Sequence, residues 1–186
     1  MLRELRHLPS TPALDQIRAS VLDFLTRCAS TRLPGVFSFW PAHTRPVWAS
    51  QVPEDADDTA IMALELARHG RLSHLELLRV LCHTLVSYRV SPIHSSIPTW
   101  IQPSAFLTWL SHDPQHSNLV NCYVNANAIA LMAYAEATHL PGDQAACQLI
   151  EQGLNWVGAS ASRLKSLTPF YPNPREFYFA LTHAVE

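Results

Sequence analysis

The chain has 186 residues, of which 48% are hydrophobic, 9% aromatic and 15% charged. This length suits one domain that buries roughly 70% of the surface of its unfolded chain, and the low charge content excludes an intrinsically disordered protein. Thirteen basic and fifteen acidic residues give a formal charge of −2. The basic stripe that binds nucleic acid is therefore missing.

The N-terminal residues contain neither the apolar core nor the cleavage site of a signal peptide. No stretch approaches the ~20 apolar residues that a membrane-spanning helix needs. We therefore expect a cytoplasmic protein without a membrane span. The four cysteines lie far apart in apolar segments, and we expect them to be reduced and buried. They are Cys28, Cys82, Cys122 and Cys147.

Apolar residues recur with helical periodicity along most of the chain, and no alternating run is long enough for a sheet. Predicted helices cover residues 14–28, 56–68, 74–85, 119–138, 143–157 and 174–184, with a short helical turn at 105–110. Prolines or a Ser-rich connection separate them. We predict an all-α fold of about six or seven helices, arranged as antiparallel hairpins in one domain over residues 1–186.

Two of the predicted helices carry apolar faces that another helix or subunit must cover. The first has a stripe that runs from Leu14 through Ile17 and Phe24 to Cys28. The last has an apolar face that includes Phe177 and needs a cover. The first helix or another subunit is expected to provide it.

The run PEDADDTA at residues 53–60 places four carboxylates within five positions at the start of a predicted helix. One interpretation is structural. Asp55 caps the helix by accepting the backbone N–H of Asp58, and Asp57 and Asp58 lie in the first turn, where the helix dipole stabilises negative charge.

A second interpretation comes from a resemblance. Residues 55–60, DADDTA, resemble the Asp-x-Asp-Asp-Thr-Ala motif of class II terpene cyclases, and a Gly-aromatic turn at residues 35–41 precedes them. The segments NCYVNAN at 121–127 and FYPNP at 170–174 are similar to stretches of bacterial toroid proteins. The chain thus resembles a short variant of the terpene cyclase and prenyltransferase-β superfamily, with squalene-cyclase-like repeats. Because it has room for about half of the helices of a full toroid, the resemblance implies a partial α/α toroid.

The resemblance also implies catalytic roles for the acidic run. Asp57 would protonate an alkene or an epoxide and so start a cyclisation, and Asp55 and Asp58 would orient its proton. Carboxylates that lie close together cannot all ionise, so one of them holds its proton near neutral pH. A dry, aromatic pocket would be needed to keep the resulting cation from water.

The residues predicted to bind the substrate are Asn121, Cys122, Tyr123, Asn125, Trp40, Trp109 and Tyr171. Asn118, Asn121 and Asn125 share one face of a predicted helix, where buried amides need partners. Structural alternatives remain open for each kind of residue. In these alternatives, Asn118 caps its helix, Asn125 joins two helices and the loop aromatics seal the core. Cys122 is then a buried hydrophobe rather than a nucleophile activated by His112 or His116.

Together with these residues, the resemblance implies a small enzyme of isomerase or lyase type that acts on an apolar, isoprenoid-like molecule. The alternative is a non-catalytic module that binds a small molecule or a protein and completes its toroid as a homodimer. No metal site is predicted, although the acidic run could hold Mg²⁺ and a diphosphate. The absence of a nearby basic clamp in the sequence argues against that ion.

Overall fold

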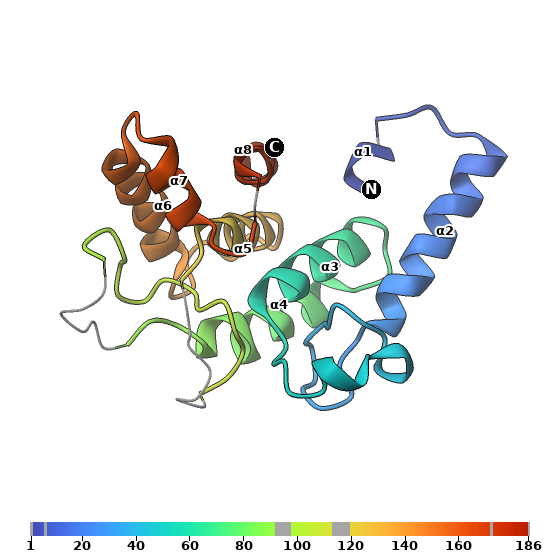
Figure 1. Ribbon diagram of the computed structural model, residues 1–186. Coiled ribbons are helices and arrows are strands. Elements are labelled where there is room, and N and C mark those ends of the chain that lie inside the picture. The colour runs from blue at the N-terminus through green and yellow to red at the C-terminus, as the bar shows by residue number, and fades with distance from the viewer. Residues whose placement is uncertain (1, 6, 92–97, 113–119, 172, 186) are drawn as a thin grey trace.

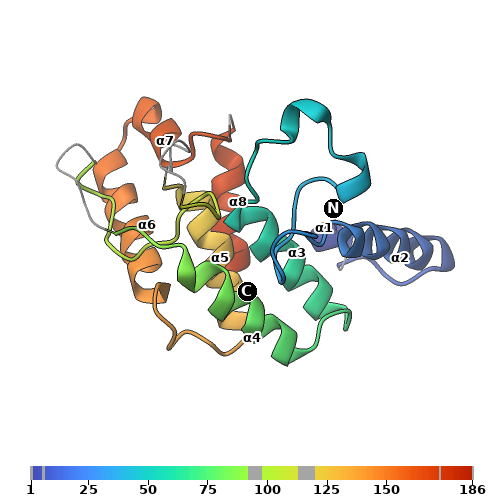
Figure 2. The same cartoon turned by 90° about the horizontal axis from the view of Figure 1, so that it is seen from below.

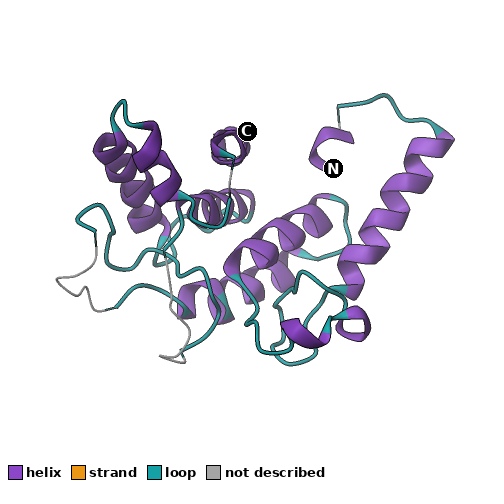
Figure 3. Cartoon of the chain, in the orientation of Figure 1, coloured by secondary structure: helices purple, strands orange, loops and turns teal. Residues whose placement is uncertain are grey.

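The computed structural model describes the chain except for residues 1, 6, 92–97, 113–119, 172 and 186 (Figure 1). In chain order the helices are α1 (Leu2–Leu5), α2 (Pro12–Arg27), α3 (Ala56–Arg68), α4 (His74–His83), α5 (Cys122–Tyr134), α6 (Asp143–Val157), α7 (Ala161–Leu167) and α8 (Pro174–Val185). Short 3₁₀ helices occupy Ala42–Thr44, Val47–Ala49 and Leu85–Ser87. Helices and loops make up all of the described part of the chain, as Figure 3 shows. The all-α prediction is confirmed, and the toroid arrangement stays a prediction.

Side chains at the helix starts explain where several helices begin. The Thr11 side chain accepts the N–H of Leu14 at 3.2 Å, and Pro12 occupies the first position of α2, where it loses no intrahelical bond. At α4, Ser73 and Glu76 form a reciprocal capping box. These local signals place the boundaries of α2 and α4 close to the predicted ones.

Helix α5 lies at the centre of the fold, and most of its residues are buried. It contacts α3, α6 and α8, which surround it in Figure 2. A helix that is buried on all sides must be apolar all round, and α5 carries alanines at 126, 128 and 130 that allow close approach of its neighbours. One buried cluster joins α5 to α3 and α4, and a second joins it to α6 and α8.

Helix α8 receives its cover from α5 rather than from the first helix of the chain. Phe177 and Ala180 on α8 are both 0% exposed. The expectation that the first helix or another subunit covers this face is therefore wrong. The physical reason is that α5, which is buried on most of its surface, offers apolar side chains to α8 on one side and to α3 on another.

Helix α2 extends away from the other helices in both views (Figures 1 and 2). Leu22 is its buried residue, whereas Ile17 and Phe24 of the predicted stripe are 46% and 42% exposed. Its neighbours in the fold are α1 and α3. The apolar stripe of α2 is therefore only partly used inside this chain.

Four other sequence-based predictions are corrected by the structure. Residues 105–110 form no helical turn but an extended loop, and residues 161–167 form a helix where a connection was expected. The central helix begins at Cys122 and ends at Tyr134, inside the predicted 119–138 range. Cys82 and Cys147 are exposed, because they lie on the outer faces of α4 and α6, whereas the other two cysteines are buried.

None of the helices in the described ranges combines the length and the apolar character that crossing a bilayer requires.

Candidate functional site

The acidic run stands at the N-terminus of α3, where its first aspartate caps the helix. Asp55 has extended backbone angles, φ −119° and ψ 161°, and its Oδ1 accepts the backbone N–H of Asp58 at 2.6 Å. The capping prediction is confirmed. This cap turns the following carboxylates in different directions, so that Asp57 is buried and Asp58 is half-buried.

An extended loop holds the acidic turn in place from the other side. The N–H of Ala56 donates to the carbonyl of Thr108 at 2.8 Å, and the N–H of Leu110 donates to the carbonyl of Glu54 at 2.9 Å. These two bonds form an isolated antiparallel bridge between Asp55 and Trp109. The pairing explains why the loop is extended here, and it sets Trp109 beside the carboxylates.

Asn125 on α5 anchors the same loop. Its Oδ1 accepts the N–H of Phe106 at 2.9 Å, while its Nδ2 donates to the carbonyls of Phe106 at 3.0 Å and Asn121 at 2.9 Å. With its amide oxygen and nitrogen both engaged in this buried position, Asn125 positions the loop. The structure therefore places it behind Trp109.

Asp57 is 6% exposed and is held between two other elements. Its Oδ1 accepts the Nδ2 amide of Asn127 on α5 at 2.8 Å, and its Oδ2 accepts the hydroxyl of Tyr171. The Tyr171 ring stacks on Tyr123, with ring centroids 4.0 Å apart. Both oxygens of Asp57 therefore accept a hydrogen bond from another part of the fold.

The environment shifts the proton affinities of the neighbouring carboxyls. Burial raises the pKa of Asp58 far above its ordinary value, and the charges of Asp55 and Asp57 raise it further. Burial, followed by the charge of Asp57, also raises the pKa of Asp55. Burial and the adjacent Asp57 charge raise the pKa of Tyr171, so its hydroxyl keeps its proton. The site therefore holds carboxyl protons near neutral pH.

A cavity of ≈ 340 Å³ opens in front of these carboxyls, and we call it the acid–aromatic cavity. Its lining includes Asp55, Asp58, Trp40, Trp109 and Tyr171. The acidic run thus faces a hollow in the molecule. Three of the aromatic residues that the sequence proposed for substrate binding meet two of the proposed acids here.

A smaller cavity of ≈ 120 Å³ lies deeper, with Asp55, Asp57 and Tyr171 in its wall. Asn121 lines it too. The Asn121 Oδ1 accepts the N–H of Tyr123 at 2.8 Å as the N-cap of α5, but its buried Nδ2 has no hydrogen-bond partner among the residues that the structure describes. A buried amide without a partner is rare in folded proteins. Asn121 therefore offers a free donor at the inner end of the site.

Further aromatic rings surround the mouth of the acid–aromatic cavity. Trp40 packs edge-on against Phe39 and Trp48, with ring centroids 4.8 and 5.4 Å apart. Trp109 packs in the same way against Phe170 at 5.6 Å. Phe39 and Trp48 are 61% and 73% exposed. The aromatic clustering predicted from the sequence therefore includes both lining rings and exposed ones.

Cys122 lies outside these cavities. It is 0% exposed, and burial raises the pKa of its thiol to about 12. A thiol in this state supplies no thiolate near neutral pH, so the structural interpretation of Cys122 holds. His112 stacks on Tyr88 instead, with centroids 4.5 Å apart. Asn118 and His116 lie outside the described residues.

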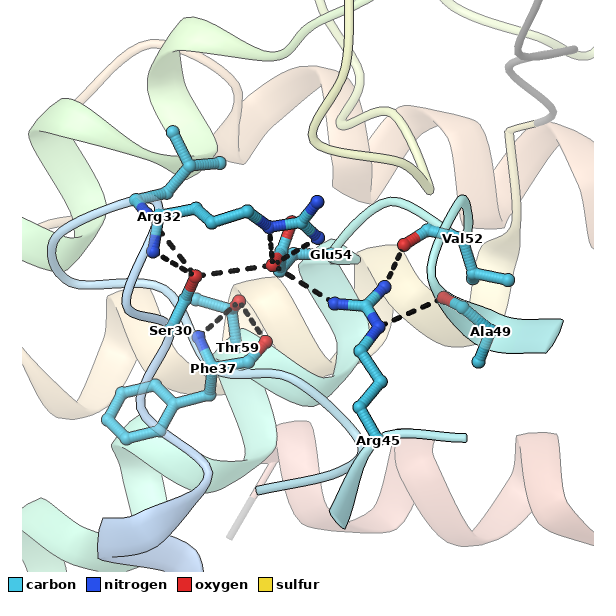
Figure 4. Close-up of polar contacts among 9 residues, drawn as sticks. Ser30, Arg32, Phe37, Arg45, Ala49, Val52, Glu54 and Thr59 are labelled. Carbon is cyan, nitrogen blue, oxygen red and sulfur yellow. Dashed lines mark hydrogen bonds and ion pairs between the residues drawn. The ribbon is translucent and has the colours of Figure 1, made fainter. Parts of the chain in front are cut away.

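A polar cluster that the sequence analysis did not predict lies beside the acidic turn, and Figure 4 draws it. Glu54 is 6% exposed, and its Oε1 accepts Nη2 of Arg32 at 2.8 Å and Nη1 of Arg45 at 3.4 Å. Burial raises its pKa, but hydrogen bonds from Arg32 and Ser30 outweigh that effect, so the pKa is lowered and Glu54 is ionised. The sequence shows no basic clamp next to the acidic run, but folding brings residues 32 and 45 to Glu54.

Asn127 is a second residue that the sequence-based prediction missed, although it belongs to the NCYVNAN segment. Asn127 and Tyr123 lie one helical turn apart on the same face of α5. Both therefore meet the Asp57–Tyr171 pair, Asn127 by its hydrogen bond to Asp57 and Tyr123 by stacking on the Tyr171 ring.

Within the described ranges, no group of three or more His, Cys, Asp or Glu side chains is placed so that it could hold a metal ion.

Comparison of the chain with models of known protein families finds no match, and comparisons with curated proteins and with solved structures find none either.

Proposed function

We propose that the protein is a small enzyme in which a protonated carboxyl donates a proton to an apolar, isoprenoid-like molecule bound in the acid–aromatic cavity. The proton would go to an alkene or epoxide of the substrate and start an isomerisation or a cyclisation. The single observation that supports this proposal most is the meeting of Asp55 and Asp58, whose pKa values are raised, with Trp40 and Trp109 around one cavity.

We assign the donated proton to Asp58. Asp58 lines the cavity and its pKa is raised by burial and by two neighbouring carboxylates. The resemblance assigned this role to Asp57, but both Asp57 oxygens accept hydrogen bonds and Asp57 does not line the acid–aromatic cavity. In this scheme the carboxylate that Asp58 becomes stabilises the cation, and Asp58 or an ionised Asp55 then takes the proton that a carbon of the cation loses as the product alkene forms.

The aromatic lining suits the charge that forms on the substrate. The faces of Trp40, Trp109 and Tyr171 present negative electrostatic potential to a carbocation, and they exclude water from it. The free Nδ2 of Asn121 would orient an oxygen atom of an epoxide substrate or of the product.

The test uses a set of isoprenoid alkenes and epoxides incubated with the protein in deuterated water. Proton donation to an alkene labels a substrate carbon with deuterium, which mass spectrometry detects, whereas donation to an epoxide oxygen leaves an exchangeable deuteron, so with epoxides the ring-opened or cyclised product is measured. Asp58→Asn should abolish labelling, by a factor of at least ~10² for loss of general acid catalysis. Asp23→Asn, which removes an exposed carboxyl of α2, should leave it unchanged. Labelling that persists in Asp58→Asn would contradict the assignment.

A second candidate function is binding of an organic cation without catalysis. Carboxyls beside aromatic faces form the kind of cage that holds an ammonium group. The two functions differ in pH dependence. Because Asp55 and Asp58 must ionise to attract a cation, its affinity would rise with pH, whereas proton donation would fall as pH rises past their pKa values.

A further inference from the structure

A cavity of ≈ 380 Å³ lies between α4 and the turn at residues 29–37, and we call it the α4 cavity. Val36 and Phe37 of the turn and Val80 of α4 line it, and they are 2%, 5% and 2% exposed. Gly35, with φ +78°, lies where an added Cβ would be 3.6 Å from the Val80 Cα atom, so the turn packs against α4 there. Its volume falls within the range of small-molecule sites, about 300–1,000 Å³.

Hydrogen bonds from the chain itself hold the turn wall of the α4 cavity. The N–H of Ser30 donates to the carbonyl of Val36 at 2.8 Å. From α3, the Thr59 Oγ1 accepts the N–H of Phe37 at 3.2 Å, and its hydroxyl donates to the Phe37 carbonyl at 3.3 Å. The Phe37 ring points away from the Glu54 cluster (Figure 4). Because these bonds fix the wall, a ligand pays little to order it.

Three exposed polar side chains line the same cavity. They are Glu76, Arg79 and His83, and together with Val80 they share one face of α4. Glu76 is already engaged, because its Oε2 accepts the backbone N–H of Ser73 at 2.7 Å and the Ser73 hydroxyl at 2.6 Å. These bonds, more than the charge of Arg79, lower the pKa of Glu76, so it is ionised.

Arg79 and His83 keep their donors for a ligand. Within the part of the chain that the structure describes, neither side chain forms a hydrogen bond or an ion pair with another residue. The two residues lie four positions apart, about one helical turn, so both can reach one group. A guanidinium and an imidazole suit a singly charged anion such as a carboxylate, which a guanidinium binds through two parallel hydrogen bonds.

We propose that the α4 cavity binds an amphipathic carboxylic acid of the size of a medium-chain fatty acid. Its apolar chain lies against Val36, Phe37 and Val80, and its carboxylate pairs with Arg79 and His83. Removal of the chain from water supplies most of the affinity, and the pairing selects a negative head group. The α4 cavity and the acid–aromatic cavity have no lining residue in common, so this site is independent of the proposed proton transfer.

Octanoate, octylamine and octanol are the probes, because they carry apolar chains of similar length and differ in the charge of the head group. Each is titrated into the ¹⁵N-labelled full chain, and NMR gives both the affinity and the place of binding. Octanoate should bind more tightly than the other two. It should shift the amide signals of Gly35 and Val80, which line the cavity, and leave the indole signal of Trp109 in place.

The deciding variant is Arg79→Gln. It should weaken octanoate binding about 5- to 10-fold, between the effect of an exposed ion pair and that of a buried hydrogen bond to a charge, and change octanol binding less than twofold. Arg27→Gln is the matched control. It removes the same charge from an exposed position at the end of α2 that does not line the cavity, so octanoate affinity should change less than twofold.

Glu76→Gln gives an independent check of the charge preference. Glutamine can replace glutamate in a capping box, so α4 should keep its start. The variant removes a negative charge from the edge of the cavity and should therefore tighten octanoate binding, whereas octanol binding should stay the same.

Four results would overturn the proposal. They are no binding of octanoate by the unmodified chain, octylamine or octanol binding as tightly as octanoate, equal weakening by Arg27→Gln and Arg79→Gln, and octanoate shifts at Trp109 without shifts at Gly35. Unfolding does not confuse the comparison, because Arg79 is exposed and glutamine is a good helix former.

Discussion

The three aspartates at the start of α3 have the same side chain but meet three different environments. Asp55 caps the helix, Asp57 accepts donors from α5 and from the segment before α8, and Asp58 is half-buried at the cavity. Their order in the sequence fixes only that they lie close together. What each carboxyl does depends on the groups that other elements bring to it.

Asp58 should make the stability of the fold depend on pH. Its pKa is raised in the folded state relative to the ordinary value of about 4 in the unfolded chain. The folded state therefore binds the proton more tightly, and stability falls as pH rises from about 4 through the raised pKa. Asp58→Asn should flatten this fall, so that melting temperature differs from the unmodified chain more at pH 8.5 than at pH 4.

Differential scanning calorimetry across this pH range measures the effect. Loss of favourable charge at the helix N-terminus, about 0.3–1 kcal/mol, opposes the gain at high pH. The change with pH is therefore the quantity to compare. A shift in melting temperature that is the same at all pH values would contradict a raised pKa for Asp58.

Tyr171 should stabilise the fold through its hydrogen bond to Asp57. Tyr171→Phe removes the hydroxyl and leaves a buried carboxylate with one donor fewer, which should cost about 1.5–3 kcal/mol in the free energy of unfolding. Urea unfolding measures this cost. The control is Tyr178→Phe at a side chain 53% exposed on α8, which should change little.

The same substitution in an Asp57→Asn background gives a second check. If the bond to Asp57 is the reason for the loss, Tyr171→Phe should cost clearly less in that background. Equal costs in the two backgrounds would mean that the loss does not come from the hydrogen bond to Asp57, because Phe keeps the ring that stacks on Tyr123.

At the scale of elements, α5 and the loop at residues 105–110 build the site together. The loop is extended because its backbone pairs with residues 54–56 and with Asn125. The spacing of apolar residues in this loop is that of a short helix, so the prediction from periodicity was wrong there. The loop is extended because it bonds to the buried Asn125 amide on α5, and this contact forms only when the two segments come together in the fold.

A substitution at Gly142 tests how this loop packs against the start of α6. It has φ +111°, a conformation that favours glycine, and an added Cβ would collide with the buried Phe106 ring, 2.6 Å from its Cε1 atom. Gly142→Ala should therefore destabilise the protein by about 2–5 kcal/mol, from backbone strain and overpacking together.

The control for this prediction is Gly70→Ala. Gly70 has φ +69° but nothing within 4 Å of an added Cβ, so only the strain of about 1–2 kcal/mol should remain. Chemical denaturation of the two variants gives the difference directly. Equal losses at the two glycines would show that Phe106 moves away without cost.

On the scale of the whole molecule, two helices carry apolar side chains toward solvent. Ile17 and Phe24 on α2 are 46% and 42% exposed, and Phe179 on α8 is 42% exposed. The partial toroid implied by the resemblance would be completed by a second copy, and these faces are where we expect it to bind. This association is a prediction that rests on the exposed apolar side chains.

Light scattering coupled to size exclusion gives the test. The unmodified chain should elute as a dimer at tens of micromolar, and Phe24→Glu should shift it to a monomer while the helical circular dichroism stays constant. Leu75→Glu, at a side chain 59% exposed on α4, serves as the control and should not change the mass. A strictly monomeric unmodified chain would contradict completion of the toroid by a second copy.

The sequence by itself determined what is local. Apolar periodicity gave most of the helices, and the side chains of Asp55 and Ser73 gave the first residues of α3 and α4, because a cap depends on groups only two or three positions away. It also predicted that acids and aromatic rings belong to one site.

Only the tertiary structure decided which acid holds a proton and what faces it. A pKa depends on burial and on charges within a few ångströms. The charges that raise the pKa of Asp58 are its neighbours Asp55 and Asp57, whereas its burial depends on the fold. The hydrogen-bond partners of Asp57 come from α5 and from Tyr171, 114 residues away along the chain. The same holds for Arg32 and Arg45, which reach Glu54 only because the chain folds back over the start of α3.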